Sequence, residues 1–259
     1  MLPYLNLFGR VIPTYSLLGV AGVLLGLLVA LARCKRFQLS ASDCAYIYVM
    51  GGVGAVIGAK LLYLIPLLPQ MIADLPLLGQ NPSLFFARYL TGGMVFYGGF
   101  LGGILGAWLE ARYFRLRFSD FFPVLVPTLP LIHALGRVGC FCAGCCYGVE
   151  AAEPWGIPFT HAIAAPNGVP LLPVQLYECA AELMIFLFLL WYAPRADSKG
   201  GILRAYMLAY APVRFVLEFF RGDVIRGIYG PLSTSQWISL AVMAAAVVWQ
   251  VRERRGNRS

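Results

Sequence analysis

The sequence His-Ala-Leu-Gly-Arg-Val-Gly-Cys-Phe-Cys-Ala-Gly-Cys-Cys-Tyr-Gly, residues 133–148, decides how the fold is interpreted. It holds one arginine, four of the seven cysteines and four glycines, and it follows an apolar segment that Pro123, Pro127 and Pro130 interrupt. Such breaks survive in a membrane only where other helices or a cavity satisfy the freed backbone groups. The first question is therefore whether Arg137 lies within a membrane.

The composition answers this question. Hydrophobic residues make up 60% of the chain, charged residues only 12%, and the mean hydropathy is +0.75, whereas a soluble domain carries about a quarter charged residues. We therefore expect an all-α integral membrane protein, with residues 1–259 forming a single seven-helix domain and an N-terminus that is not cleaved. The net charge of +8 does not indicate nucleic acid, because the basic residues fall at the ends of apolar runs.

Seven apolar segments and the distribution of basic residues predict the topology. The segments are 13–32, 43–68, 92–111, 121–139, 173–193, 201–219 and 232–251. With seven spans, thirteen of the 20 basic residues fall on one side, which the positive-inside rule makes the cytoplasm. These thirteen are Arg33, Lys35, Arg36, Arg112, Arg115, Arg117, Arg195, Lys199, Arg204, Arg252, Arg254, Arg255 and Arg258. The N-terminus is then outside, the C-terminus is cytoplasmic, and loops 69–91, 140–172 and 220–231 face outward.

Ionisable residues also occur within or at the ends of these apolar segments. They are Lys60, Arg137, Glu178, Glu182, Arg214, Glu218 and Arg221. Each costs about 2.5–3.5 kcal/mol at bilayer depth on insertion scales, so they are expected to face the bundle interior or an aqueous cavity. They form either structural ion pairs or an anion-binding cavity, and the latter suits arginine, whose guanidinium binds phosphate through two parallel hydrogen bonds.

Four stretches occur in an order and spacing that are together distinctive. They are Gly-Gly-Met-Val-Phe-Tyr-Gly-Gly at 92–99, Gly-Arg-Val-Gly-Cys-Phe at 136–141 continuing to Gly144 and Gly148, Pro-Val-Gln-Leu-Tyr-Glu at 173–178, and Arg-Phe-Val-Leu-Glu-Phe-Phe-Arg at 214–221 followed by Asp223. In this order the chain resembles the prolipoprotein diacylglyceryl transferase family, from Tyr15 to Gln236. Any one of these motifs is weak alone.

The resemblance implies a multi-pass enzyme of the bacterial inner (plasma) membrane, with seven spans, an outside N-terminus and no cofactor. Such an enzyme transfers diacylglycerol from phosphatidylglycerol to the lipobox cysteine of a preprolipoprotein and releases glycerol phosphate. By this resemblance Arg137 is the essential arginine, Arg214 and Arg221 are the basic pair, and Glu218 orients one of them. The other residues expected to bind substrate are Tyr15, Gly98, His133, Gly148, Gln175, Tyr177 and Glu178.

Three positions depart from the family pattern. Tyr97 replaces a histidine, Cys140 an asparagine and Cys145 a glutamate. Because tyrosine has a reference pKa near 10, it is a poorer base than histidine at neutral pH. We therefore expect Tyr97 to orient the donor by hydrogen bonding, while a thiolate of the cysteine cluster or of the acceptor supplies the nucleophile. The predicted catalytic residues are Arg137, Arg214, Tyr97, Cys140 and Cys145.

The cysteines at 140, 142, 145 and 146 allow four interpretations. A disulfide is favoured by their position on the outer face, where the compartment can be oxidising. Catalytic thiols are favoured by Arg137, whose charge lowers the pKa of a neighbouring thiol. Close packing at a glycine-rich turn is the third, and a metal site is the least favoured because the ligands are bunched, so no metal is expected. Cys34, Cys44 and Cys179 are expected to be apolar packing residues.

Other features leave further alternatives open. His133 lies one helical turn before Arg137 and is either a buried, hydrogen-bonded residue or the missing base. Gly51, Gly52, Gly54 and Gly58 are interpreted as small-residue packing between helices. The alternative functions are a related lipid-modifying enzyme with a different acceptor, a thiol-redox membrane protein using Cys140 to Cys146, and an anion transporter. The absence of an inverted repeat disfavours the transporter.

Overall fold

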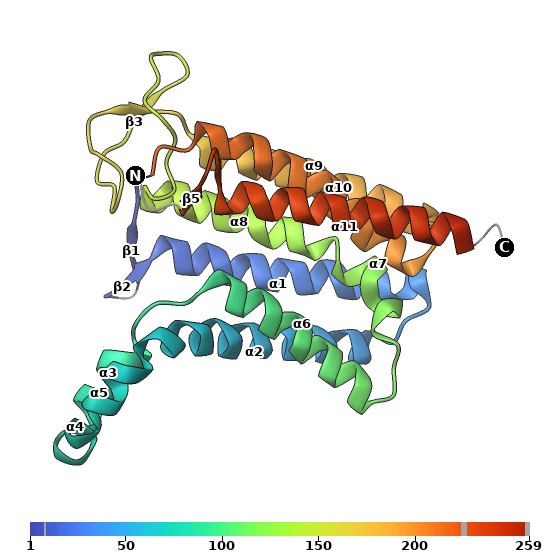
Figure 1. Cartoon of the computed structure of the whole chain (residues 1–259), viewed down its shortest axis with the longest axis horizontal. Coiled ribbons are helices and arrows are strands. Elements are labelled where there is room, and N and C mark those ends of the chain that lie inside the picture. The colour runs from blue at the N-terminus through green and yellow to red at the C-terminus, as the bar shows by residue number, and fades with distance from the viewer. Residues whose placement is uncertain (8, 224–226, 257–259) are drawn as a thin grey trace. The chain divides into compact units, whose positions relative to one another are not determined.

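The computed structural model describes residues 1–7, 9–223 and 227–256 (Figure 1). Arg258, one of the thirteen basic residues above, lies outside these residues. The chain divides into two compact units, a large unit of Met1–Arg33 with Phe122–Ser259 and a small unit of Cys34–Phe121. The expectation of a single domain for residues 1–259 stays a prediction.

Six α-helices of the large unit lie within the residues that the structure describes. Its helices are α1 (Thr14–Cys34), α7 (Phe122–Leu125), α8 (Thr128–Ala143), α9 (Val174–Tyr192), α10 (Lys199–Leu217) and α11 (Thr234–Gly256), with 3-10 turns η4 (Ala193–Arg195) and η5 (Glu218–Phe220). Its antiparallel strand pairs are β1 (Tyr4–Leu7) with β2 (Arg10–Pro13), β3 (Ile157–Pro158) with β4 (Pro170–Leu171), and β5 (Ile228–Tyr229) with β6 (Leu232–Ser233). Helix α9 packs against α8 and α10, and α10 packs against α11.

The two ends of the large unit differ in charge. At one end, Nη2 of Arg33 donates to the Pro123 carbonyl oxygen at 3.5 Å, Arg204 pairs with Glu253, and α7 contacts both η4 and α10. The basic ends of α1 and α11 therefore lie at the α7 end. The N-terminus lies at the opposite end, where the Met1 ammonium donates to the Thr160 carbonyl oxygen at 2.8 Å (Figure 1). This separation agrees with the predicted basic face without testing which side of the membrane it occupies.

The small unit is built on a close crossing of α2 (Ala41–Leu64) and α6 (Phe96–Tyr113). A Cβ atom added to Gly54 would lie 2.2 Å from the Gly102 carbonyl oxygen, and one added to Gly58 would lie 2.3 Å from that of Gly98. Only glycine permits backbones to approach so closely, and small residues commonly mediate such helix contacts in membranes. The predicted packing role is thereby confirmed for Gly54 and Gly58, and Gly51 also faces α6, whereas a Cβ atom added to Gly52 would meet no atom within 4 Å, so its predicted packing role is wrong.

The remaining elements of the small unit are short. They are η1 (Lys35–Phe37), η2 (Ile65–Leu67), α3 (Leu68–Ala73), α4 (Leu75–Gln80), α5 (Pro82–Leu90) and η3 (Phe118–Phe121). Lys60, which the sequence places within an apolar segment, points its ammonium at backbone carbonyl oxygens, with 2.8 Å to that of Gly92. The charge is thus satisfied by the loop that precedes α6.

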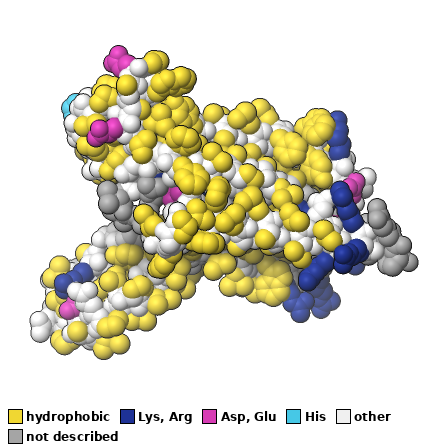
Figure 2. Space-filling view, turned by 45° about the horizontal axis from the view of Figure 1, so that its top comes forward, with side chains coloured by type: hydrophobic (Ala, Val, Ile, Leu, Met, Phe, Trp, Pro, Cys, Tyr) yellow, Lys and Arg dark blue, Asp and Glu magenta, His cyan; other side chains and the backbone are white. Residues whose placement is uncertain are grey.

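The hydrophobic pattern is that of a protein in lipid. On α9 the carboxylates of Glu178 and Glu182 are buried, whereas Met184, Leu187 and Trp191 are exposed. Figure 2 shows hydrophobic side chains covering most of the visible face, with Lys and Arg gathered mainly at its ends. Polar groups inside and apolar groups outside reverse the arrangement of a soluble protein, as expected where the surrounding solvent is hydrocarbon.

Each of the seven predicted segments overlaps a helix, but fewer meet the criteria for a span. Four helical stretches are long and apolar enough, namely Thr14–Phe37, Ala41–Ala73, Val174–Arg195 and Thr234–Arg255. The pair Phe118–Leu125 and Thr128–Ala143, bent by 47°, would make a fifth, and this bend falls at the predicted proline breaks. The prediction of a mostly helical membrane protein is thus confirmed at the level of four or five candidate spans. Helices α6 and α10 are less apolar because they carry charged residues such as Glu110, Arg112, Arg204 and Arg214.

Candidate active site

Helices α8 and α9 bring Arg137 and Glu178 together. His133 and Arg137 are four residues apart on α8 and therefore share a face. Nε of Arg137 donates to Nε2 of His133 at 3.1 Å and lies 3.0 Å from Oε2 of Glu178. The Glu178 side chain is 2% exposed and the Arg137 side chain 15%, so water screens their attraction only weakly.

The neighbouring turn of α9 adds Glu182, which is fully buried. Its Oε1 lies 2.6 Å from Nδ1 of His133. If Nδ1–H donates to this carboxylate, the lone pair on Nε2 is left to accept from Arg137, which fits the neutral imidazole. We assign this tautomer from the hydrogen-bond network. Helix α9 thus holds His133 in one orientation, with Nε2 also 3.5 Å from Oε1 of Glu178.

Helix α10 carries the second arginine of the site. Nη2 of Arg214 lies 2.7 Å from Oε2 of Glu218 and donates to the Ser235 hydroxyl of α11 at 3.2 Å. Nη1 of Arg214 is buried and has no hydrogen-bond partner among the residues that the structure describes. One turn earlier, the ring of Tyr210 lies 5.6 Å from the ring of His133 and links this pair to the α8–α9 cluster.

Arg221 follows η5 and is fixed by both its side chain and its backbone. Its Nε and Nη2 lie 2.9 and 2.5 Å from the two carboxylate oxygens of Asp223, which is a bidentate ion pair. Its backbone pairs with Gly148 as an antiparallel bridge, beside a Val149 to Phe220 hydrogen bond of 2.9 Å. The loop after α8 and the segment after α10 are therefore held in one register.

Gly148 is required by this pairing. A Cβ atom at that position would lie 2.4 Å from the Leu172 carbonyl oxygen and 2.6 Å from Cγ2 of Val174. The Gly148 N–H also donates to the Leu172 carbonyl oxygen at 3.1 Å. The glycine thus allows three chain segments to meet at the end of α8, and its observed role is packing of the backbone beside Arg221.

Three of the four clustered cysteines converge. The Sγ atoms of Cys140, Cys145 and Cys146 all lie within 4.8 Å of one another. Nη1 of Arg137 lies 3.9 Å from Sγ of Cys140, so the cluster borders the Arg137–Glu178 pair. All seven cysteines are free thiols in the structure. The predicted ability of two of these cysteines to form a disulfide stays a prediction, which the short Sγ separations support.

The loop that carries two of these thiols is fixed by glycine and by Gln175. Gly144 ends α8 with φ +68°, and Cys146 has φ +56°, a left-handed conformation that is uncommon for residues with a side chain. Buried Gln175 donates through Nε2 to the Cys145 carbonyl oxygen at 2.7 Å. Hydrogen bonds from the thiols of Cys140 and Cys145 lower the pKa of Cys146, and the charges of Arg221 and Arg137 lower it further, against the effect of burial.

The other predicted residues of the large unit lie at the margins of this cluster. Tyr15 packs on Gly139, where an added Cβ atom would come within 3.1 Å of the tyrosine Cα. Tyr15 and Tyr177 are partly exposed, at 52% and 38%. Cys34 and Cys44 are buried, as their predicted packing role requires, whereas Cys179 is only partly buried.

Tyr97 and Gly98 belong to the small unit. Tyr97 lies in the first turn of α6, is 45% exposed, and contacts the ring of Phe96 edge-on at 5.7 Å. Gly98 approaches α2, since an added Cβ atom would lie 2.2 Å from the Gly58 carbonyl oxygen. The glycine after Tyr97 therefore serves a helix contact, and the predicted roles of both residues toward substrate stay predictions.

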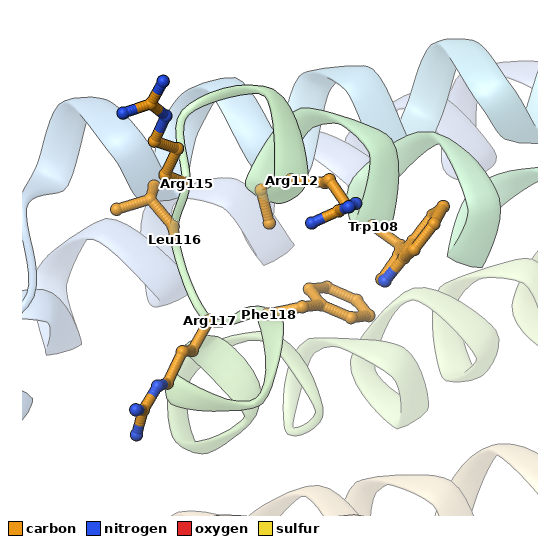
Figure 3. Close-up of a pocket in the computed structure, with 7 residues that line it drawn as sticks. Trp108, Arg112, Arg115, Leu116, Arg117 and Phe118 are labelled. Carbon is orange, nitrogen blue, oxygen red and sulfur yellow. The ribbon is translucent and has the colours of Figure 1, made fainter.

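Two hollows border the described residues. One of about 200 Å³ is lined by Glu218, Phe219, Ile228, Pro231, Ser233 and Gln236, so it adjoins the Arg214–Glu218 pair. The other, of about 370 Å³, lies at the end of α6, where Arg112 points toward Trp108 and Phe118 while Arg115 and Arg117 point away (Figure 3). The exposed arginines there belong to the predicted basic interface, and the hollow beside Glu218 is the one near the site.

Sequence reasoning did not include Glu182, Tyr210 and Ser235 in the site. The signal for Glu182 was its spacing of four residues from Glu178, which puts both carboxylates on one face of α9. Tyr210 likewise lies four residues before Arg214. Ser235 had no such signal, because its contact depends on how α11 packs against α10.

Comparison with known proteins identifies the family. The sequence profile described as "Prolipoprotein diacylglyceryl transferase" matches residues 4–252. This chain belongs to the prolipoprotein diacylglyceryl transferase family. The resemblance inferred from the four motifs is thereby confirmed, and with it the classification of the chain as a transferase.

Individual relatives agree over nearly the full length. The chain is 33% identical over 235 residues to the phosphatidylglycerol–prolipoprotein diacylglyceryl transferase of Clostridium tetani, covering 91% of this chain and 90% of that protein. It is 32% identical over 254 residues to transferase 2 of Clostridium perfringens, covering 98% and 96%. The corresponding protein of Clostridioides difficile is 28% identical over 254 residues.

Proposed function

We propose that this chain transfers the diacylglyceryl group of phosphatidylglycerol to the lipobox cysteine thiol of a preprolipoprotein. In this reaction a sulfur–carbon bond forms at the glyceryl carbon, the carbon–oxygen bond to phosphate breaks, and glycerol phosphate leaves with the electron pair. The thiol proton passes to a base. The substrates are those named for the relatives. The observation that carries the proposal is the Arg137–Glu178 pair within a motif of the family, which the contact between His133 and Tyr210 links to the helix of Arg214.

The arginines suit a phosphodiester donor. Nη1 of Arg214 is buried without a partner among the described residues, and Glu218, which pairs with Nη2 of Arg214, lines a hollow of about 200 Å³. A phosphate oxygen placed there would satisfy this donor and would bring negative charge among Arg137, Arg214 and Arg221. Donors aimed at the charge that develops on the leaving phosphate stabilise the transition state. We propose that Glu178, Glu218 and Asp223 hold these guanidinium groups in position while the headgroup is absent.

The proton of the acceptor thiol needs a base, and His133 is our proposed base. Oε1 of Glu182 lies 2.6 Å from its Nδ1, and a proton on Nδ1 directed at this carboxylate would leave Nε2 as a lone-pair site beside Arg137. When Arg137 turns toward phosphate, Nε2 becomes available to the thiol. Cys140 and Cys145 belong to the proposed catalytic set, Tyr97 orients the donor, and Tyr15, Gln175, Tyr177, Gly98 and Gly148 shape the substrate site.

The finer topology is also part of the proposal. We propose seven spans in a bacterial inner membrane, with the N-terminus and the 140–172 loop outside and the C-terminus in the cytoplasm. The clustering of the basic ends of α1 and α11 supports a shared cytoplasmic face. Reporter fusions at residue 259 should be active only with a cytoplasmic reporter, and an active periplasmic reporter there would contradict this orientation.

The function is tested with purified protein, phosphatidylglycerol vesicles and a lipobox peptide. A peptide mass increased by one diacylglyceryl group, with release of glycerol phosphate, is expected, and a peptide with serine in place of cysteine is the matched control. Modification of another acceptor would identify a different lipid-modifying enzyme. Thiol–disulfide exchange without lipid transfer would overturn the proposal in favour of redox chemistry.

A further inference from the structure

The thiols of Cys140, Cys145 and Cys146 form a preassembled ligand set. Their three Sγ atoms lie within 4.8 Å of one another, although the residues come from the last turn of α8 and the loop after it. Zinc–sulfur bonds of about 2.3 Å in a tetrahedral site put sulfurs about 3.8 Å apart. Each pair therefore needs to contract by about 1 Å at most, which side-chain rotation can supply.

The backbone that presents these thiols is fixed independently of them. The Cys145 N–H donates to the Cys140 carbonyl oxygen at 3.1 Å, and Gln175 binds the Cys145 carbonyl oxygen at 2.7 Å. An added Cβ atom on Gly144 would lie 2.4 Å from Cβ of Ala162. Cys146 is held at φ +56°, and strained conformations of this kind cluster at functional sites.

The surroundings of the cluster also suit bound thiolates. Cys140 is buried, whereas Cys145 and Cys146 are partly accessible and leave a path for an ion. Three thiolates and one divalent cation carry a net charge of −1. The guanidinium group of Arg137, 3.9 Å from Sγ of Cys140, compensates this charge, and Arg221 acts electrostatically on Cys146.

We propose that Cys140, Cys145 and Cys146 form a binding site for a thiophilic metal ion such as zinc. Three protein ligands leave the fourth tetrahedral position open, as in zinc sites that bind an exchangeable ligand. On binding, each thiol releases its proton to solvent, so the ion is held by three thiolates. This inference goes beyond the proposed transfer reaction, and the bound ion would withhold Cys140 and Cys145 from it.

Cys142 provides the matched control within the same stretch. It lies two residues after Cys140 on α8, about 200° around the helix, so it is directed away from the other three thiols. Its Sγ atom is not part of the converging group. Cys142→Ser therefore removes one thiol from the stretch without removing a ligand.

The test is zinc binding to the full-length, reduced protein in detergent, measured by elemental analysis and by sulfur–metal charge-transfer absorption with cadmium. We expect one ion per chain. Cys140→Ser, Cys145→Ser and Cys146→Ser should each weaken binding by more than the roughly 10–100-fold that loss of a residue orienting a metal ligand costs. Cys142→Ser should retain one ion, and thermal melting in detergent verifies that each variant is folded.

Three results would overturn the site: less than one tenth of an ion per chain, unchanged affinity in folded Cys145→Ser and Cys146→Ser, or equal loss in Cys142→Ser. A disulfide between two of the three thiols in protein isolated without reductant would show that these cysteines do not hold a metal ion in the resting protein. Zinc stoichiometry does not depend on lipid transfer. A protein that transfers lipid without binding zinc contradicts only this inference, and one that binds zinc but transfers no lipid after the metal has been removed with a chelator contradicts only the proposed function.

Discussion

Nε of Arg137 lies 3.0 Å from Oε2 of Glu178, and this ion pair joins α8 to α9 inside the large unit. Removing one partner of a buried pair is costly because the other charge stays uncompensated, by about 3–5 kcal/mol. The pair is therefore expected to position Arg137 as well as to stabilise the fold. Glu178 contacts Nε of Arg137. A phosphate would therefore bind at the other guanidinium nitrogens of this side chain.

Arg137→Ala is expected to lower lipid transfer by about a hundredfold to a thousandfold, the usual cost of losing one donor to a developing anion. Arg137→Lys should also be impaired, because an ammonium cannot donate to His133 and a phosphate with the fork of a guanidinium. The measurement is initial transfer rate with phosphatidylglycerol and lipobox peptide. Arg112→Ala, at an exposed arginine of α6, is the control, and full activity of folded Arg137→Ala would exclude the proposed role.

Glu182→Gln tests whether the carboxylate positions His133. The amide can keep a hydrogen bond but lacks the charge that stabilises a protonated imidazole. We therefore expect kcat to fall by about tenfold to a hundredfold, less than the roughly hundredfold to ten-thousandfold that loss of the base itself costs. KM for phosphatidylglycerol should stay within about twofold, since Glu182 does not touch the donor site in this proposal. If the double variant with His133→Gln loses no more activity than His133→Gln alone, the two residues act as one unit, whereas additive losses would separate them.

Gly148→Ala is expected to abolish most activity without touching a charged group. The new Cβ atom would lie 2.4 Å from the Leu172 carbonyl oxygen, so the loop must move and carry the backbone partner of Arg221 with it. Gly19→Ala is the matched control in α1, where an added Cβ atom meets no atom within 4 Å. Transfer rate and melting temperature in detergent are compared for both. Wild-type activity in Gly148→Ala would show that the register beside Arg221 is not needed.

The helices and the arginine pairs could be foreseen because their signals are local. Each of the seven predicted apolar segments overlaps a helix, a spacing of four residues placed His133 and Arg137 on one face, and the family resemblance assigned Glu218 to orient one of the arginines. The number of spans was harder to predict, since α10 carries Arg204 and Arg214, whose partners Glu253 and Glu218 satisfy them inside the protein. Hydropathy values take no account of such ion pairs, so they underestimate how readily this helix spans a membrane.

The convergence of the thiols could not be foreseen for a related reason. Bunched cysteines were expected to make a poor metal site, but the turn at Gly144 and the left-handed Cys146 return two thiols toward Cys140. That geometry depends on contacts with Ala162 and Gln175, which are distant in sequence. The partners of Arg214 on α11 and of Gly148 on the 220–222 segment were hidden in the same way.

Tyr97 is the departure from the family pattern that most affects the chemistry. Gly98, the residue after Tyr97, is a glycine because it packs on Gly58. Nothing in the structure explains why position 97 is tyrosine instead of histidine. A tyrosine hydroxyl can donate a hydrogen bond to a phosphate or ester oxygen. The proposed role of Tyr97 is therefore a hydrogen bond to the donor.

Comparison of Tyr97→Phe with Tyr97→His decides between that role and simple anchoring of α6 at the interface. Loss of a hydrogen bond to a charged phosphate should cost about 1.5–3 kcal/mol, or roughly a tenfold to hundredfold lower transfer rate in Tyr97→Phe. Tyr113→Phe, at the exposed far end of the same helix, should retain full activity. Wild-type rates in Tyr97→Phe would reduce Tyr97 to an interfacial anchor. A Tyr97→His protein that transfers faster to lipobox peptide would instead show that the tyrosine alters how the acceptor is used.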